Sequence, residues 1–394
     1  MGRLAIHPSA ALAKLMKERR LEMGLSLREV QRETEEAGVP IPFSTLSKVE
    51  QGKVDPGIKR LQVLLRLYRV PVQLAADLLE IEDFAADLPS KSVPIAQLQE
   101  DGVEHWRAGR LHEGMACLLA LRQRQPTEST SREERHRALL SFSIAAKSLG
   151  KIRLAHQIVE NLLLEPPEAE LLINVLVQGA TCWHALGSTE AALGFLLRAE
   201  SHLGPRDHKQ RAWVFQGRAL VFFSIDQFDE TETALDIAVA AYEEAGDHYG
   251  VCQTIGTRIQ LAFARSDYSE ALALSVKGRD LAAQHGFGRL RILRRIDEGR
   301  ARFWGGEKEA GIQMLQKALG EAVAENDHIL AFHGHHALWK AYDAQGNRHR
   351  ADLELSSAEY YARFVDEHSP EMVEVRAVDP HMDALNARTP CDRY

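Results

Sequence analysis

A repeat of about 40 residues runs through most of this chain and constrains its fold more than any other feature. In each period a glycine or serine is followed five residues later by a small residue, and the segment 225–227 is expected to supply one further, degenerate turn. Periods of this length are typical of stacked helical hairpins. The pairs are Gly109/Gly114, Gly150/Ala155, Gly187/Ala192, Ser266/Ala271, Gly305/Ala310 and Gly346/Ala351.

Each period is predicted to be two helices joined by that turn. Apolar residues recur at helical spacing in 171–186 and 190–203, and the pattern returns in 211–225 with 228–245 and in 251–265 with 268–285. The turn residue permits a tight reversal, and the small residue lets the paired helices touch. Because neither helix can bury its apolar face alone, neighbouring pairs must stack into a solenoid.

This pattern resembles the tetratricopeptide repeat (TPR) family. The family's consensus is matched by Trp106, by the Gly-x4-Ala turns and by Tyr268. The resemblance implies an α-solenoid of about seven TPR-like hairpins over residues 98–365. Residues 366–394, which contain three prolines, are expected to form a C-terminal capping segment or tail. An unrelated helical bundle is the alternative fold.

The amino-terminal segment differs from the repeats in charge. Residues 1–76 contain 13 Lys and Arg against 8 Asp and Glu, whereas the whole chain has a net charge of −8. A small basic head on a large acidic body suggests that only the head approaches a polyanion.

Five short helices are expected in this head, so that the whole chain is predicted to be all-α. Gly24 ends the first helix, Ser26 and Glu29 form a capping box for the second, and Gly52 ends the third. Two prolines in 38–42 separate the second helix from the third. The expected helices are 10–23, 27–37, 43–51, 58–68 and one from Pro71 to about residue 79.

The head resembles the phage-repressor-like (XRE) helix-turn-helix family through Arg20, the segments 24–26, 29–30 and 44–52, and Pro56. In that family the third helix enters the major groove of DNA. The resemblance assigns base contacts to Phe43, Ser44, Ser47 and Lys48, and phosphate contacts to Arg28, Thr45 and Lys53. It also implies a buried, structural ion pair between Arg20 and Glu50. For Phe43, a role as a core residue beside the prolines is the alternative.

The two modules together resemble the RRNPP group of bacterial regulators, which are cytoplasmic receptors for short peptide signals. We therefore expect an XRE-like helix-turn-helix domain over 1–88, a linker over 89–97 and the TPR-like body. The resemblance implies a double-stranded DNA operator, a homodimer formed through the body and a peptide effector on its concave face. A protein partner, a small-molecule effector, or a scaffold whose head no longer reads DNA remain alternatives.

The effector site is expected on the first helix of each pair, because repeat stacking aligns these helices along the concave wall. Polar residues aligned by the turn glycine form the candidate set, which changes from amides in the middle repeats to cations in the last two. Amides suit an extended peptide backbone, and the cations suit its carboxylate end. The predicted residues are Asn174, Thr181, Gln216, Gln253, Gln260, Arg295, Arg302, His333, His336 and Lys340.

No catalytic residue, cofactor or metal site is predicted. Nucleotide-binding and hydrolase motifs do not occur in the sequence, and the histidines near His333 have no third ligand fixed by spacing. The four cysteines are far apart, which favours reduced thiols in a cytoplasm. No apolar run approaches the roughly 18 residues of a membrane span, so no membrane association is expected.

Overall fold

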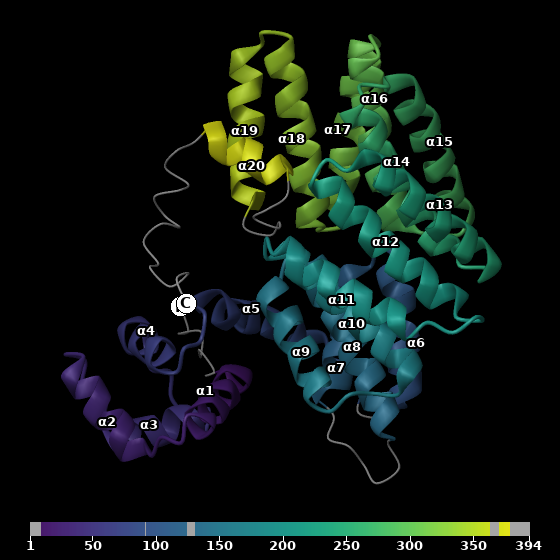
Figure 1. The fold of residues 1–394 in the computed structure, drawn as a ribbon. Coiled ribbons are helices and arrows are strands. Elements are labelled where there is room, and N and C mark those ends of the chain that lie inside the picture. Colours follow the sequence, from purple (N-terminus) through teal and green to yellow (C-terminus); the bar gives the residue numbers. More distant parts are fainter. Residues whose placement is uncertain (1–8, 91, 124–130, 363–369, 379–394) are drawn as a thin grey trace. The chain divides into compact units, whose positions relative to one another are not determined.

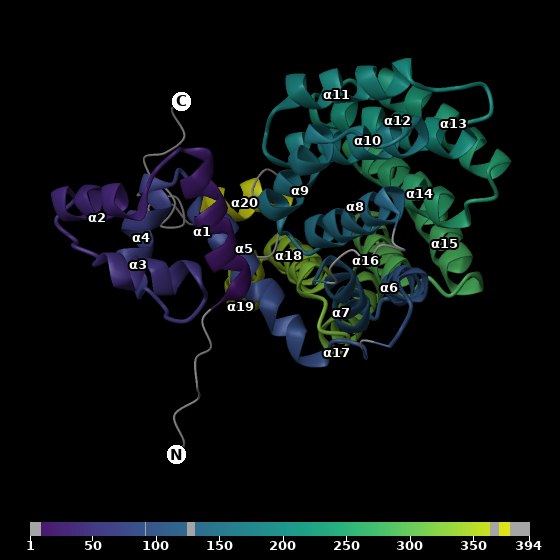
Figure 2. The ribbon, with the colours of Figure 1, turned by 90° about the horizontal axis from the view of Figure 1, so that it is seen from below.

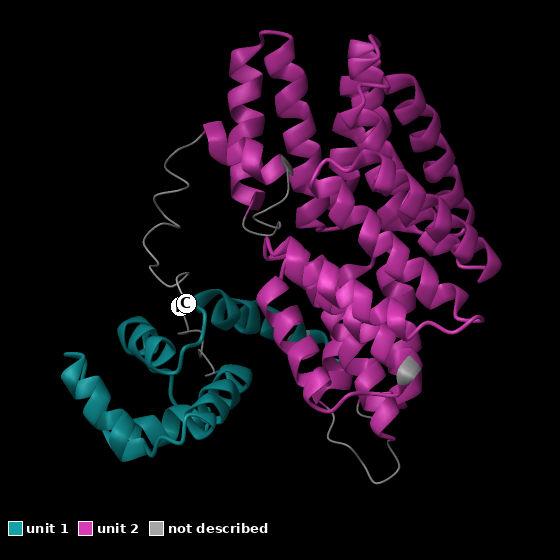
Figure 3. Ribbon diagram, in the orientation of Figure 1, with its two compact units in different colours: residues 1–88 teal, residues 89–394 magenta. Residues whose placement is uncertain are grey.

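A computed structural model of the chain describes residues 9–90, 92–123, 131–362 and 370–378. These residues form α-helices, one 3-10 helix and connecting turns, and they contain no β-strand. The chain divides into two compact units, residues 1–88 and residues 89–394 (Figure 3). We call the first unit the head and the second the body.

The described part of the head consists of five short α-helices whose ends follow the sequence signals closely. Ser26 and Glu29 form the expected capping box at the start of α2, and Gly24 and Gly52 have the positive φ that follows a helix end. Leu46 and Val49 are buried on α3 as predicted. The helices are α1 (Ala10–Glu22), α2 (Leu27–Glu36), α3 (Phe43–Glu50), α4 (Ile58–Leu67) and α5 (Val72–Glu82), followed by the 3-10 helix η1 (Asp83–Asp87).

The described residues of the body form seven antiparallel helix pairs, visible as a stack that coils through Figure 1. The first helix of each pair contacts the first helix of the next, so these inner helices form a continuous wall. They are α6 (Ile95–Ala108), α8 (Arg132–Ser148), α10 (Ala169–Ala185), α12 (His208–Ser224), α14 (His248–Ala264), α16 (Gly288–Trp304) and α18 (His328–Ala344). Their partners are α7 (Leu111–Gln123), α9 (Ile152–Leu164), α11 (Thr189–Ser201), α13 (Phe228–Glu244), α15 (Tyr268–Gln284), α17 (Lys308–Ala324) and α19 (Arg348–Ala362).

The turn within each pair has one residue of positive φ, and its position corrects one prediction. Asp226 and Ser266 take this conformation, as does Gly346. In the sixth pair the residue is Gly306, with φ 105°, and not Gly305, which ends α16 with φ −77°. The prediction at Gly305 was wrong by one residue because two adjacent glycines can each satisfy the pattern. The last four turns, centred on positions 226, 266, 306 and 346, are therefore evenly spaced along the chain.

The coil of helix pairs brings the first pair against the fifth and sixth. The end of α6 packs against the start of α16 (Figure 2), where a Cβ on Gly288 would lie only 2.2 Å from the carbonyl oxygen of Ala108. The Arg289 guanidinium lies 5.9 Å from the Trp106 ring, and that of Arg107 lies 5.0 Å from the Tyr249 ring. The glycine at the start of α16 is thus what permits this close approach.

Both ends of the body contain helical residues outside the expected repeat region 98–365. α6 begins at Ile95, so part of the expected linker 89–97 is helical. Within the expected C-terminal capping segment or tail, residues Pro370–Val378 form a further helix, α20, whose Met372 and Val375 are buried in the core cluster of α16 to α19. Burial of these two side chains explains why the segment is helical despite the prolines nearby. Residues 379–394 lie outside the described part of the chain.

No helix among the described residues combines the length and the apolar character that a membrane crossing requires. The same residues hold no cluster of three or more His, Cys, Asp or Glu side chains arranged to bind a metal ion.

Candidate DNA interface and effector site

In the head, α3 is held against α2 by hydrogen bonds that leave its outer face uncovered. The backbone N–H of Phe43 donates to Oε1 of Gln31 over 3.0 Å, which caps the start of α3. The backbone N–H of Ile41 donates to the Thr34 hydroxyl over 3.3 Å, and the Ile41 side chain is fully buried. Ile41, and not Phe43, is therefore the apolar residue that closes the long α2–α3 turn over the core.

The predicted DNA-contacting residues lie on one accessible surface around α3. Phe43 keeps 46% of its surface exposed, which disfavours the alternative that it is a core residue. Ser44 and Lys48 are exposed on α3, and Thr45 and Ser47 are partly buried there. Arg28 on α2 and Lys53 after α3 are also exposed. In the described part of the head, no carboxylate lies within ion-pair distance of the basic residues Arg28, Lys48 and Lys53.

An ion pair inside the head fixes α3 to α1, as the resemblance implied. Nε and Nη2 of Arg20 donate to the two oxygens of Glu50 over 2.6 and 2.8 Å, and Nη1 donates to the carbonyl of Leu25 over 2.7 Å. The hydrogen bond to Glu50 raises the pKa of Arg20 above its ordinary value. This bidentate arrangement orients α3 without using its exposed face.

In the body, the position of each predicted effector residue relative to its turn determines which face of the inner helix it occupies. Counting back from the positive-φ turn residue, positions −13, −10 and −6 fall on one helix face, and we call this face the inner stripe. Adjacent repeats touch along it: Nη1 of Arg300 donates to Oε1 of Gln260 over 3.4 Å, and both residues are at position −6. In α10 to α18 the polar residues of the stripe are Asn174, Thr181, Gln216, Gln253, Gln260, Arg300, His333, His336 and Lys340.

Arg295 and Arg302 do not lie on the inner stripe, contrary to the prediction. Arg295 forms an ion pair with Glu321 of α17. Arg295 was predicted because the register of α16 was counted from Gly305. A shift of one residue in that count turns the selected face by about 100° around the helix. Arg302 falls at none of the three stripe positions and pairs with Glu298 at 3.1 Å and with Glu307 at 2.7 Å. Counting from Gly306 instead places Arg300 on the stripe.

The amide-rich middle of the stripe is already partly engaged. The Tyr242 hydroxyl donates to Oε1 of Gln216, and Nε2 of Gln260 donates to Oδ1 of Asp297 over 3.3 Å. The Thr181 hydroxyl donates to the carbonyl of Gln178 over 2.9 Å. Gln253 is exposed on α14, and Asn174 is partly buried on α10.

The cation-rich end of the stripe faces two carboxylates of α20, which sequence reasoning missed. Nε2 of His336 and Nζ of Lys340 each lie 3.0 Å from Oε2 of Glu374. Nδ1 of His333 lies 4.0 Å from Oε1 of Glu371. The hydrogen bonds from His336 and Lys340 lower the pKa of Glu374 to about 2. Burial lowers the pKa of His333, and the nearby Glu371 opposes that effect.

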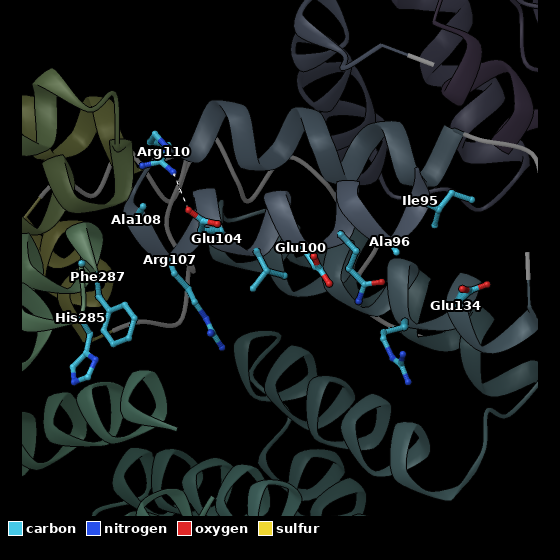
Figure 4. A pocket seen from close by; sticks show the side chains of 14 residues that line it. Ile95, Ala96, Glu100, Glu104, Arg107, Ala108, Arg110, Glu134, His285 and Phe287 are labelled. Carbon is cyan, nitrogen blue, oxygen red and sulfur yellow. Dashed lines mark ion pairs between the residues drawn. The ribbon is translucent and has the colours of Figure 1, made fainter. Parts of the chain in front are cut away.

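A separate pocket of about 810 Å³ opens between α6, α8 and the turn from α15 to α16 (Figure 4). Its wall carries charges of both signs, among them Arg110 and Glu104, whose side chains lie 4.0 Å apart. His285 and Phe287 close one end of it. The described residues that line this pocket include none of the ten predicted effector residues.

Comparison with known families identifies the head. Residues 16–74 match the family model described as "Helix-turn-helix". The head thus contains a helix-turn-helix domain of the XRE type, whose third helix is the exposed α3. A comparison with curated protein sequences gives no significant match.

Comparison with solved structures identifies the fold of the body. A Rap protein complexed with competence and sporulation factor is similar with a TM-score of 0.54 at 12% identity, over 75% of this chain and 87% of that chain. The apo form of RapI gives 0.48 at 15% identity, over 69% and 98%. Bacillus thuringiensis PlcR in complex with the peptide PapR7 and DNA gives 0.33 at 13% identity, over 95% and 99%. The first similarity shows that the body has the helical-repeat fold of a Rap protein.

A helix-turn-helix head followed by a TPR-like body is the architecture expected from the RRNPP resemblance. The family match supports a DNA-binding head, and the structural similarity shows that a helical-repeat body follows it.

Proposed function

We propose that this protein is a transcription regulator that reads double-stranded DNA with α3 and responds to an effector bound along the inner stripe. The observation that carries the proposal is the exposed basic surface of a domain whose sequence matches the helix-turn-helix family. Lys48 can contact guanine O6 and N7 in the major groove, and Phe43 can contact a thymine methyl group. Arg28 and Lys53 supply phosphate contacts that set the register.

The proposal includes a homodimer formed through the body. One helix of 8 residues presents too little surface for strong sequence specificity, so two heads on a near-palindromic site are expected. Light scattering of the full chain should give twice the mass of one chain. A mass of one chain at all concentrations would contradict the dimer.

The proposed effector is a short peptide, and the alternatives are a protein partner and a small molecule. The stripe offers hydrogen-bonding amides at Gln253 and Asn174, followed by cations from Arg300 to Lys340. A Rap protein with a similar repeat fold has been solved in complex with competence and sporulation factor, which supports a ligand on this fold. We place the carboxylate-bearing part of the effector at the cation-rich end.

Selection from a random pool of double-stranded DNA tests the DNA-binding function. The full chain should enrich a near-palindromic sequence, and binding should weaken as salt rises because phosphate contacts release counterions. The variant Lys48→Ala should enrich the same sequence with one base position relaxed. Absence of any enriched sequence for the wild-type chain would contradict the proposal.

A further inference from the structure

The C-terminal helix α20 lies on the inner stripe of the last repeats, where the effector is proposed to bind. Glu374 is within 3.0 Å of both His336 and Lys340, and Glu371 pairs with His333. Arg300 of the preceding repeat also stabilises the charge of Glu371. Two carboxylates, one helical turn apart on α20, therefore contact three basic side chains of α18, and the charge of Arg300 on α16 acts on one of them.

Apolar contacts seat the same helix. Met372 and Val375 are 3% and 0% exposed and belong to one buried cluster with Phe332 and Trp339 of α18. Val373 is instead 55% exposed on the outer side of α20. The helix thus presents an acidic and apolar face to the stripe and leaves its other face in solvent.

This contact stabilises both carboxylates of α20 in their charged form. Burial acts to raise the pKa of Glu371, but His333 and Arg300 outweigh it and hold that pKa below its ordinary value. Glu374 is still more strongly stabilised as an anion by His336 and Lys340. The end of the stripe is consequently a site that favours carboxylates above an apolar floor.

We propose that α20 is an intramolecular occupant of the effector site, and that an acidic peptide binds Arg300, His333, His336 and Lys340 by displacing it. The inference rests on the proposed function, because it takes the inner stripe as the effector site. The peptide that fits has two carboxylates about one helical turn apart with apolar side chains between them, since α20 itself has that pattern.

Competition follows from the covalent attachment of α20. A tethered segment has an effective concentration of order millimolar, so a free peptide must overcome it before it binds. An effector that succeeds frees α20 from the wall of the last repeats. Occupancy of the stripe is thereby coupled to the position of the C-terminal helix.

The test uses a fluorescent synthetic peptide with the sequence of residues 370–378 and the full-length chain. In the variant Glu371→Lys/Glu374→Lys, like charges beside Arg300 and Lys340 should release α20, and fluorescence anisotropy should show peptide binding about tenfold or more tighter than to wild type. The matched control is Glu354→Lys. Glu354 pairs with His335 at 2.6 Å, which is not on the inner stripe, and so this variant should bind like wild type.

Hydrogen exchange on the unmodified protein gives a second readout. Saturating peptide should accelerate exchange of the backbone amides of 370–378, whereas a peptide with both glutamates replaced by glutamine should not. Equal peptide affinity for wild type and the double variant, or exchange that ignores the peptide, would overturn the inference. DNA binding measured on the same wild-type sample separates the two proposals: its absence contradicts the proposed function, and its presence without a peptide effect contradicts only the role of α20.

Discussion

The head and the body both gather cations on helices, but they leave them in opposite states. On and beside α3, Lys48, Arg28 and Lys53 are exposed and have no ion-pair partner in the described part of the head. On the inner stripe of the last repeats, His336 and Lys340 contact the same carboxylate of α20 at 3.0 Å. The exposed cations around α3 are accessible to a polyanion, whereas those at the end of the inner stripe already contact a carboxylate of the same chain.

This difference indicates how each surface can work. An exposed cation gives up little when it meets a phosphate, so the head can bind DNA at once and with a strong salt dependence. A cation that already has a partner gains affinity for a ligand only when that partner leaves. A ligand at the end of the inner stripe therefore has to exchange for α20, and such an exchange can carry a signal.

The largest effect should come from breaking the Arg20–Glu50 ion pair, which holds α3 in place. The variant Glu50→Ala leaves the Arg20 guanidinium without its buried partner and should destabilise the head by about 3–5 kcal/mol. The control Glu36→Ala removes a carboxylate whose pairing with Arg32 is exposed, so it should cost less than about 1 kcal/mol. Chemical denaturation, read together with DNA binding, measures both. Equal stability of the two variants would contradict the role given to the Arg20–Glu50 pair.

A smaller effect is expected where the body closes on itself. A methyl group at Gly288 would overlap the carbonyl of Ala108, so Gly288→Ala should destabilise the body by about 1–3 kcal/mol. Gly320→Ala on α17 is the control, since a Cβ there meets no atom within 4 Å. That substitution should be stabilising by about 0.5–1 kcal/mol, because alanine favours a helix interior. Thermal unfolding should therefore move in opposite directions for the two variants, and a shared direction would show that α6 does not pack on α16.

The register of the inner stripe predicts a difference between two arginines of α16. Arg300→Ala should weaken the acidic probe peptide about tenfold in the chain with α20 released, equivalent to about 1.4 kcal/mol. Arg295→Ala should change that affinity by less than about twofold, because Arg295 pairs with Glu321 away from the stripe. Anisotropy titrations compare the two. A larger loss for Arg295 would restore the register counted from Gly305.

The smallest effect concerns a phosphate contact of the head. Lys53→Ala should weaken binding to all DNA sequences alike and should reduce the slope of log affinity against log salt by about one. The measurement is a salt titration with the preferred sequence and an unrelated one. A change in sequence preference would instead place Lys53 against a base edge.

Local signals in the sequence were sufficient for much of the fold. The capping box at Ser26 and the glycines at 24 and 52 predict the helix ends of the head closely. The period of small residues predicts the helix pairs, because each turn needs a residue that tolerates positive φ. Even Asp226, in the degenerate turn, has this conformation.

The parts that the sequence did not predict depend on contacts between distant segments. The choice between Gly305 and Gly306 has no local signal, although a strictly even spacing of the turns would have favoured Gly306. Arg300 was missed for that reason. His336 and Lys340 share the partner Glu374, which lies far along the chain in a helix that nothing in the repeat pattern requires. Only the packing of the apolar side chains of α20 explains its place.

The most direct test of the account measures whether the open surface of the head reads DNA. Affinity for the selected sequence should be determined for wild type, Lys48→Ala and the control Lys277→Ala, an exposed lysine of α15 in the body. We predict that Lys48→Ala loses about 1–3 kcal/mol and relaxes one base position, and that Lys277→Ala binds like wild type. Wild-type affinity and unchanged sequence preference for Lys48→Ala would contradict the assignment of α3 as the reading helix.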